Sequence, residues 1–164
     1  MIGVGVNRFE SDPDAFAARW CVVAQSSFRG SPFAVAEESP LLIQAQIEAV
    51  VPVSDLETAL RFYGETLGLR VIERVGNAEA RLGAGEGSLT IYESEAAGAS
   101  GATLAAFLVE DLDDALRQLR ARGVAPIDYD LPNLRTNDGI ATIGRTRVAW
   151  IADPDGNLLA VNTI

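Results

Sequence analysis

The chain has 164 residues, with 13 basic and 23 acidic side chains and a formal net charge of −10 at pH 7. A surface this acidic repels phosphate and anionic lipid, so neither a nucleic acid nor a membrane is an expected partner. Hydrophobic residues make up 48% of the chain, which is typical of a folded globular protein, and no apolar run reaches the roughly 18 residues of a membrane span.

All the basic residues are arginine, because the sequence contains neither histidine nor lysine. Without histidine the chain lacks the commonest general base and the commonest metal ligand. Without lysine it can form neither a Schiff base nor a P-loop. The single cysteine, Cys21, excludes an intrachain disulfide, and a reducing, cytoplasmic location is therefore expected.

Residues 1–40 are expected to form an N-terminal extension, separate from a domain over 41–164. They carry no long apolar period, although residues 14–24 have the composition of a short helix. Acidic residues stand where a signal peptide would be basic, so no signal peptide is expected. Three interpretations stay open for this extension: a packed arm, a disordered lead, or an upstream start that is not the natural one.

The first half of the domain is predicted to contain a strand, a helix and three further strands. In the strand over 42–53, Gln44, Gln46 and Glu48 occupy alternate positions and therefore share one face. Ser54 or Asp55 is the expected N-cap of a helix that ends at Gly68. The three strands that follow are expected at 69–75, 77–82 and 88–93.

The second half repeats this order after a small-residue linker at 94–102. The segment DLETALR at 55–61 recurs as DLDDALR at 111–117, which indicates an internal duplication. A strand at 103–109 precedes the second helix, which is expected to close at Gly123. Further strands are predicted at 124–128, 143–151 and 157–162, so that residues 45–93 and 103–164 form two βαβββ modules.

Two segments carry a resemblance to a known family: VSDLETALRFY at 53–63, followed by LGL at 67–69, and DPDGNLL at 153–159. In this order, on a duplicated frame, they resemble the vicinal oxygen chelate superfamily of glyoxalases, bleomycin resistance proteins and extradiol dioxygenases. The resemblance covers about residues 45–164. It implies an α+β fold of tandem βαβββ modules whose sheets form an open curled sheet around a central, ligand-binding cleft.

The resemblance also implies four metal-ligand positions, which fall here at Glu48, Leu104 and Ala160 and near Ile91. Three of these are apolar, whereas a divalent metal needs three or four oxygen, nitrogen or sulfur donors. We therefore expect no metal and no cofactor.

Strand alternation extends the resemblance to the residues expected to line the cleft. They are Glu48, Val50, Leu104, Ala106, Val148, Trp150, Leu158, Ala160 and Asn162. Trp150 offers a flat stacking surface. Glu48, beside the apolar Leu104 and Ala160, is expected to have a pKa raised by desolvation, as in a catalytic base or an anchor for an ammonium group.

Three functions follow from these expectations. The favoured one is a metal-free protein that binds an apolar or aromatic compound, with a cationic group as an option. The second is an enzyme, either a lyase, isomerase or dioxygenase-related protein with Glu48 as its catalytic acid–base group, or a metalloenzyme with a different ligand set. The third is a regulatory module whose cleft is filled by residues 1–40. A homodimer is expected, because relatives commonly pair and the polar face of the first strand needs a cover or water.

Overall fold

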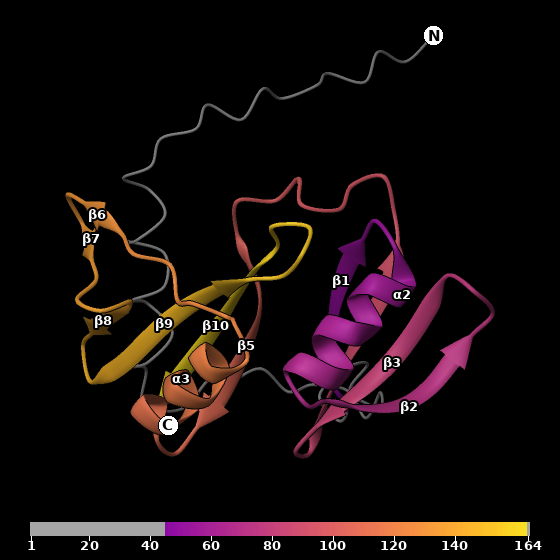
Figure 1. The fold of residues 1–164 in the computed structure, drawn as a ribbon, viewed down its shortest axis with the longest axis horizontal. Helices are drawn as coiled ribbons and strands as arrows, with labels where there is room; N and C mark the ends of the chain where they lie inside the picture. The colour runs from indigo at the N-terminus through magenta and orange to yellow at the C-terminus, as the bar shows by residue number, and fades with distance from the viewer. Residues whose placement is uncertain (1–44, 164) are drawn as a thin grey trace, which may run out of the picture.

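The computed structural model describes residues 45–163, which form two sheets side by side with a helix on the same side of each (Figure 1). The first half contains β1 (Ala49–Val53), α2 (Leu56–Leu60), its continuation η2 (Arg61–Thr66), β2 (Arg70–Val75), β3 (Glu79–Ala84) and β4 (Gly87–Glu93). The second half contains β5 (Thr103–Val109), α3 (Leu112–Ala121), β6 (Asp130–Leu131), β7 (Leu134–Arg135), β8 (Ile140–Ile143), β9 (Thr146–Ala152) and β10 (Leu158–Thr163). The predictions for residues 1–40, including Cys21, and for Gln44 lie outside the described residues.

The two main sheets have the same topology. Their strand orders are β1-β4-β3-β2 and β5-β10-β9-β8. In each sheet the first strand of the module pairs in parallel with the last, and the other neighbours are antiparallel. The edge strands β1 and β5 lie next to each other where the sheets meet. This repeat confirms the expected α+β fold. Within the described range no helix is long and apolar enough to cross a membrane.

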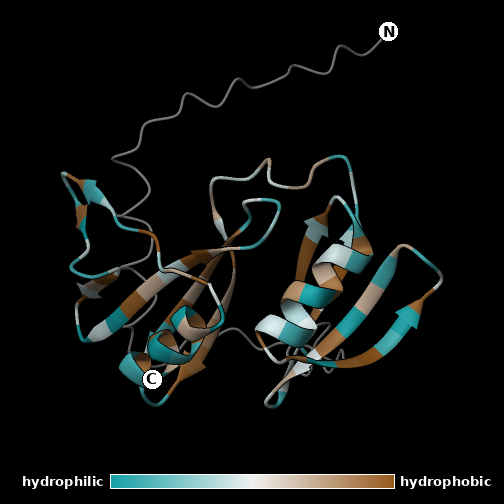
Figure 2. Ribbon diagram, viewed as in Figure 1, coloured by the Kyte–Doolittle hydropathy of each residue, from teal (hydrophilic) through white to brown (hydrophobic). Residues whose placement is uncertain are grey.

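Both helices begin at an aspartate. The Asp55 carboxylate accepts a hydrogen bond from the Thr58 amide at 2.7 Å, and the Asp111 carboxylate accepts one from the Asp114 amide at 2.9 Å. These contacts satisfy amides that have no partner within the helix. The apolar side of α3 packs against its sheet, while Figure 2 shows hydrophilic residues on the outward side.

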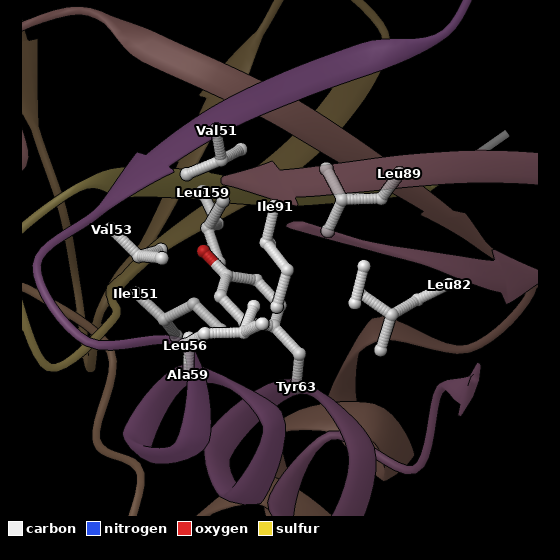
Figure 3. Packing of buried hydrophobic residues seen from close by; sticks show 11 residues of the cluster. Val51, Val53, Leu56, Ala59, Tyr63, Leu82, Leu89, Ile91, Ile151 and Leu159 are labelled. Atoms are coloured by element: carbon white, nitrogen blue, oxygen red, sulfur yellow. The ribbon is translucent and has the colours of Figure 1, made fainter. Parts of the chain in front are cut away.

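One hydrophobic core joins the two halves. The helix of the first half contributes Leu56, Ala59 and Tyr63, which pack in one cluster with residues of β1 and with Ile151 and Leu159 of the second half (Figure 3). The Tyr63 side chain is fully buried. Because one cluster includes residues from both sheets, neither half encloses its apolar surface alone.

The turn at residues 153–157 connects the two halves through hydrogen bonds. Asp153 Oδ2 accepts from the Tyr63 hydroxyl at 2.8 Å and from Asn157 Nδ2 at 2.9 Å. Asn157 Nδ2 also donates to the Pro52 carbonyl at 2.8 Å, and Asn157 Oδ1 accepts from the Gly98 amide at 3.1 Å. The DPDGN segment therefore links the first strand, the first helix and the linker.

The second half departs from the prediction between α3 and β9. Residues 124–128 form no strand, and the predicted strand at 143–151 is divided by a turn at Gly144, whose φ is +63°. Pro126 lacks an amide hydrogen and interrupts the first of these segments; there the Ile127 amide donates to the Trp150 carbonyl at 2.7 Å. The edge position beside β9 belongs to β8, and β6 and β7 form a separate short hairpin.

Candidate functional site

The face of each sheet that lies opposite its helix, here called the open face, contains most of the predicted site residues. In β1, Val51 and Val53 are fully buried in the core, so alternation places Glu48 and Val50 on the open face. Cross-strand pairing aligns Val50 with Thr90, and Thr90 with Arg81. Glu48 and Val50 thus share their face with polar residues of β3 and β4.

Glu48 is the centre of a polar cluster that consists of Glu48, Arg81, Ser88 and Thr90. Arg81 Nε donates to Glu48 Oε1 at 2.6 Å, and Arg81 Nη2 donates to Ser88 Oγ at 3.2 Å. Hydrogen bonding from Ser88, and then from Arg81 and Thr90, lowers the pKa of Glu48 despite the opposing effect of burial. The expectation of a raised pKa was therefore wrong, because polar partners surround this carboxylate in place of Leu104 and Ala160.

On the second sheet, two cross-strand rows bring together most of the remaining predicted residues. One row aligns Ala106 with Ala160 and Ala160 with Trp150, and the other aligns Leu108 with Asn162 and Asn162 with Val148. Glu48 and Trp150 thus lie on different sheets, which meet at the junction of β1 and β5.

Part of the open face of the second sheet is already covered by the chain itself. Leu134 of β7 packs against the buried cluster of Ala141, Val148 and Ala160. The rings of Tyr129 and Trp150 meet edge to face, with centroids 5.5 Å apart. Trp150 Nε1 donates to Thr103 Oγ1 at 3.1 Å, which fixes the orientation of the indole. Burial also raises the pKa of Tyr129.

Beside this covered region, Val50, Ala106 and Leu108 are exposed on the two strands that meet at the sheet junction. Val50 is 52% exposed and Leu108 is 65% exposed. Asn162 is buried, and its Oδ1 atom accepts no hydrogen bond from the part of the chain that the structure describes. The accessible part of the open face is therefore apolar at the junction and polar on the first sheet.

Two predicted positions, Leu104 and Ile91, have surroundings that simple strand alternation did not anticipate. A β-bulge shifts the pairing of β5 with β10 between Leu158 and Leu159, and Leu104 packs against the main core. Leu158 is partly buried and pairs with Ala152. Ile91 is fully buried in the same core, so the open-face residues of β4 are its neighbours Thr90 and Tyr92.

The residues at the four metal-ligand positions do not fit a divalent metal. Only Glu48 has a donor atom, and its carboxylate is engaged by Arg81. Leu104, Ala160 and Ile91 offer carbon alone. Among residues 45–163 no three His, Cys, Asp or Glu side chains gather as a metal site would require.

A groove of about 230 Å³ lies on the helix side and contains none of the predicted site residues. It runs between the end of the first helix and α3. Its lining is Leu67, Leu69, Phe107, Val109, Ala115, Gln118, Leu119, Arg122, Ile151 and Val161.

The sequence analysis missed Arg81, Ser88 and Thr90. For Arg81, the signal in the sequence is the alternation of β3, in which this residue stands between the buried Ala80 and Leu82. That pattern places Arg81 opposite the core but does not reveal which strand pairs with β3. Its contact with Glu48 depends on the sheet order, which the sequence pattern alone leaves undetermined.

Comparison with known proteins agrees with this architecture. A model of the Glyoxalase/Bleomycin resistance protein/Dioxygenase superfamily matches residues 45–161. No curated protein matches the chain in a sequence search.

Three solved structures illustrate the likeness. TnmS3, an antibiotic binding protein from Streptomyces sp. CB03234, is 27% identical with a TM-score of 0.56, over 71% of this chain and 92% of that one. A glyoxalase/bleomycin resistance protein from Catenulispora acidiphila is 28% identical with a TM-score of 0.55, over 72% and 96%. A lactoylglutathione lyase from Agrobacterium tumefaciens is 17% identical with a TM-score of 0.53, over 73% and 93%, and shares the fold alone.

Proposed function

Because the chain belongs to the glyoxalase/bleomycin resistance protein/dioxygenase superfamily, we propose that it is a metal-free member that binds a small apolar or aromatic compound on the open face. The observation that carries the proposal is the chemistry of the four metal-ligand positions: one holds a carboxylate already paired with Arg81, and the other three hold apolar side chains. The likeness to the antibiotic binding protein TnmS3 supports the same choice.

The ligand would lie over the junction of β1 and β5. Val50, Ala106 and Leu108 are exposed there and would supply apolar contact. Trp150, half-buried on the adjoining row, would supply an aromatic surface. Small-molecule sites commonly combine apolar walls with a few fixed polar groups, and the polar cluster around Glu48 fits that description.

A catalytic role for Glu48 has less support. A general base works best when its pKa is near the working pH, and the hydrogen bonds from Ser88, Arg81 and Thr90 move the pKa of Glu48 the other way. We therefore propose binding in preference to a lyase or isomerase reaction.

The proposal is tested by a thermal-shift screen with small aromatic compounds, followed by mapping of amide chemical shifts in the full-length protein. A ligand that binds the native state raises the unfolding temperature. We expect the shifts to concentrate at Val50, Ala106, Leu108 and Trp150, and Trp150→Ala to weaken binding about tenfold while Trp150→Phe retains most of it. Shifts confined to the helix-side groove would contradict the proposed location.

The donor set gives a separate prediction about metals. After dialysis against Zn²⁺, Ni²⁺, Mn²⁺ or Fe²⁺ and removal of free ions, elemental analysis should find less than one bound metal per chain. Stoichiometric metal that is lost in Glu48→Gln would refute it, because binding would then depend on the one donor at the four positions.

A further inference from the structure

The Glu48–Arg81 pair determines which charge the open face presents to a ligand. The Glu48 carboxylate accepts from Arg81 Nε at 2.6 Å. Because Arg81 balances the charge of this carboxylate, an ammonium group would have to compete with Arg81 for it.

Arg81, by contrast, has N–H groups that form no hydrogen bond within the described residues. A guanidinium has five N–H groups, and those of Arg81 form hydrogen bonds through Nε to Glu48 and through Nη2 to Ser88. Within residues 45–163 Arg81 donates to no other group. Its side chain is 42% exposed, against 30% for Glu48. The group with free hydrogen-bonding capacity at this site is therefore the cation.

The position of Arg81 suits a ligand with two distinct ends. Arg81 aligns with Thr90, and Thr90 aligns with Val50 on the edge strand β1. Strands in a sheet lie about 4.8 Å apart, so Arg81 and Val50 are separated by about 10 Å across the sheet. That span matches a fused two-ring aromatic compound whose apolar body covers Val50 and whose polar end reaches Arg81.

Two carboxylates limit where an anion can bind. Glu73 is the cross-strand neighbour of Arg81 on the outer strand β2, and Glu79 lies on the same face of β3. Neither forms an ion pair with Arg81 in the described structure. Glu73 lies on the outer strand, and Glu79 lies two residues before Arg81 on the same strand. An anionic group would therefore approach Arg81 from the side of β4 and β1, where Glu48 is already paired with Arg81 and where Thr90 and Val50 are uncharged.

We propose that Arg81, held in place by Glu48, is the charged anchor of this site, and that the ligand is an aromatic compound bearing a carboxylate. This inference rests on the proposed binding function and specifies its ligand class. Glu48 then acts as a positioning residue, and the cationic ligand that the sequence analysis allowed is disfavoured.

The experiment uses three probes of one shape: 2-naphthoate, the neutral 2-naphthamide and the cationic 2-naphthylmethylamine. Naphthyl fluorescence is titrated with the full-length protein and four variants. We expect naphthoate to bind most tightly and the amine most weakly. Arg81→Gln should weaken naphthoate binding about tenfold or more and abolish the preference for the acid over the amide.

Glu48→Gln provides the decisive contrast, because it removes a carboxylate but retains Arg81. If Arg81 is the anchor, naphthoate binding should tighten by about threefold to tenfold as the site gains a net positive charge. If Glu48 is instead an anchor for cations, the same change should weaken amine binding. This variant keeps the inference testable even if Arg81→Gln fails to fold.

A matched pair on β2 and α2 controls for net charge. Arg74 and Glu57 also form an ion pair, with side chains 44% and 63% exposed. Arg74→Gln and Glu57→Gln cause the same changes in net charge and should leave all three affinities unaltered. If these variants shift binding as much as those of Arg81 and Glu48, the effect is long-range electrostatics and the inference is wrong.

The outcomes distinguish a failure of the role of Arg81 from a failure of the proposed binding function. If none of the probes binds at millimolar concentration, the proposed aromatic-binding function is overturned, and the inference with it. If the amine binds as tightly as the acid and Arg81→Gln has no effect, the binding function stands and the role of Arg81 is refuted.

Discussion

Tyr63 buries a phenol whose hydroxyl has its acceptor in the other half of the molecule. The hydroxyl donates to Asp153 Oδ2 at 2.8 Å. Burial, and then the charge of Asp153, raise the pKa of Tyr63. The phenol therefore stays protonated through the physiological pH range. Its hydrogen bond to Asp153 keeps the same donor over that range.

Tyr63→Phe should lower the free energy of unfolding by about 2 kcal/mol, because it removes a buried hydrogen bond to a charged acceptor. Asp153→Ala should cost more, because it leaves Tyr63 and Asn157 without their acceptor. Urea denaturation measures both values. Tyr92→Phe is the control: Tyr92 is only partly buried and its hydroxyl forms no hydrogen bond in the described structure, so a change below about 0.5 kcal/mol is expected. Equal losses for Tyr63→Phe and Tyr92→Phe would contradict the role of the Asp153 contact.

Glu48 should titrate below its usual value of 4.5. Since folding lowers this pKa, the ionised carboxylate stabilises the native state at neutral pH, and that contribution is lost as the pH falls through the folded-state pKa. Side-chain carboxyl NMR measures the midpoint directly. Ser88→Ala, which removes the largest favourable contact, should raise it. A midpoint at or above 4.5 in the unmodified protein would show that the polar cluster does not form in solution.

At the scale of elements, the linker between the halves is held in place at Gly98. This residue has a φ of +67°, and a Cβ built there would lie 2.1 Å from the Asp155 carbonyl oxygen. The neighbouring Gly101 has open space around it. The linker therefore contains one glycine that the structure requires and another that it does not.

Gly98→Ala should lower the free energy of unfolding by about 3 kcal/mol, since it combines an unfavourable backbone conformation with a clash against the main chain. Gly101→Ala should change it by less than about 0.5 kcal/mol. Thermal or urea unfolding of the two variants under the same conditions provides the test. If both are neutral, the linker does not pack on the 153–157 turn as described.

The helices and strands could be predicted from the sequence wherever a local pattern of residues marks their ends or their faces. Asp55 and Asp111 as N-caps, and Gly68 and Gly123 as helix ends, have clear local signals. The hairpin of β6 and β7 could not, because strands of two residues each are too short to show a period. The polar cluster around Glu48 was missed for another reason: Arg81 lies 33 residues away in sequence, and only the sheet order brings the two together.

At the scale of the whole molecule, the sheet junction exposes apolar side chains that a ligand or a second chain would remove from water. Leu108 is 65% exposed and Val50 is 52% exposed. We predict a homodimer, which light scattering after gel filtration should detect as twice the 17.4 kDa of one chain. A monomer mass at every micromolar concentration tested would contradict it.

The 153–157 turn also has a consequence for the order in which the protein can be made. Tyr63 and its acceptor Asp153 are 90 residues apart, and Ile151 and Leu159, which complete the core around the first helix, are synthesised long after that helix. Contacts this distant in sequence form late and slow folding. A nascent first half, although complete in its strands and helix, therefore emerges with the apolar side of that helix uncovered. It must stay unassociated with other chains until β9 and β10 of its own second half have been synthesised.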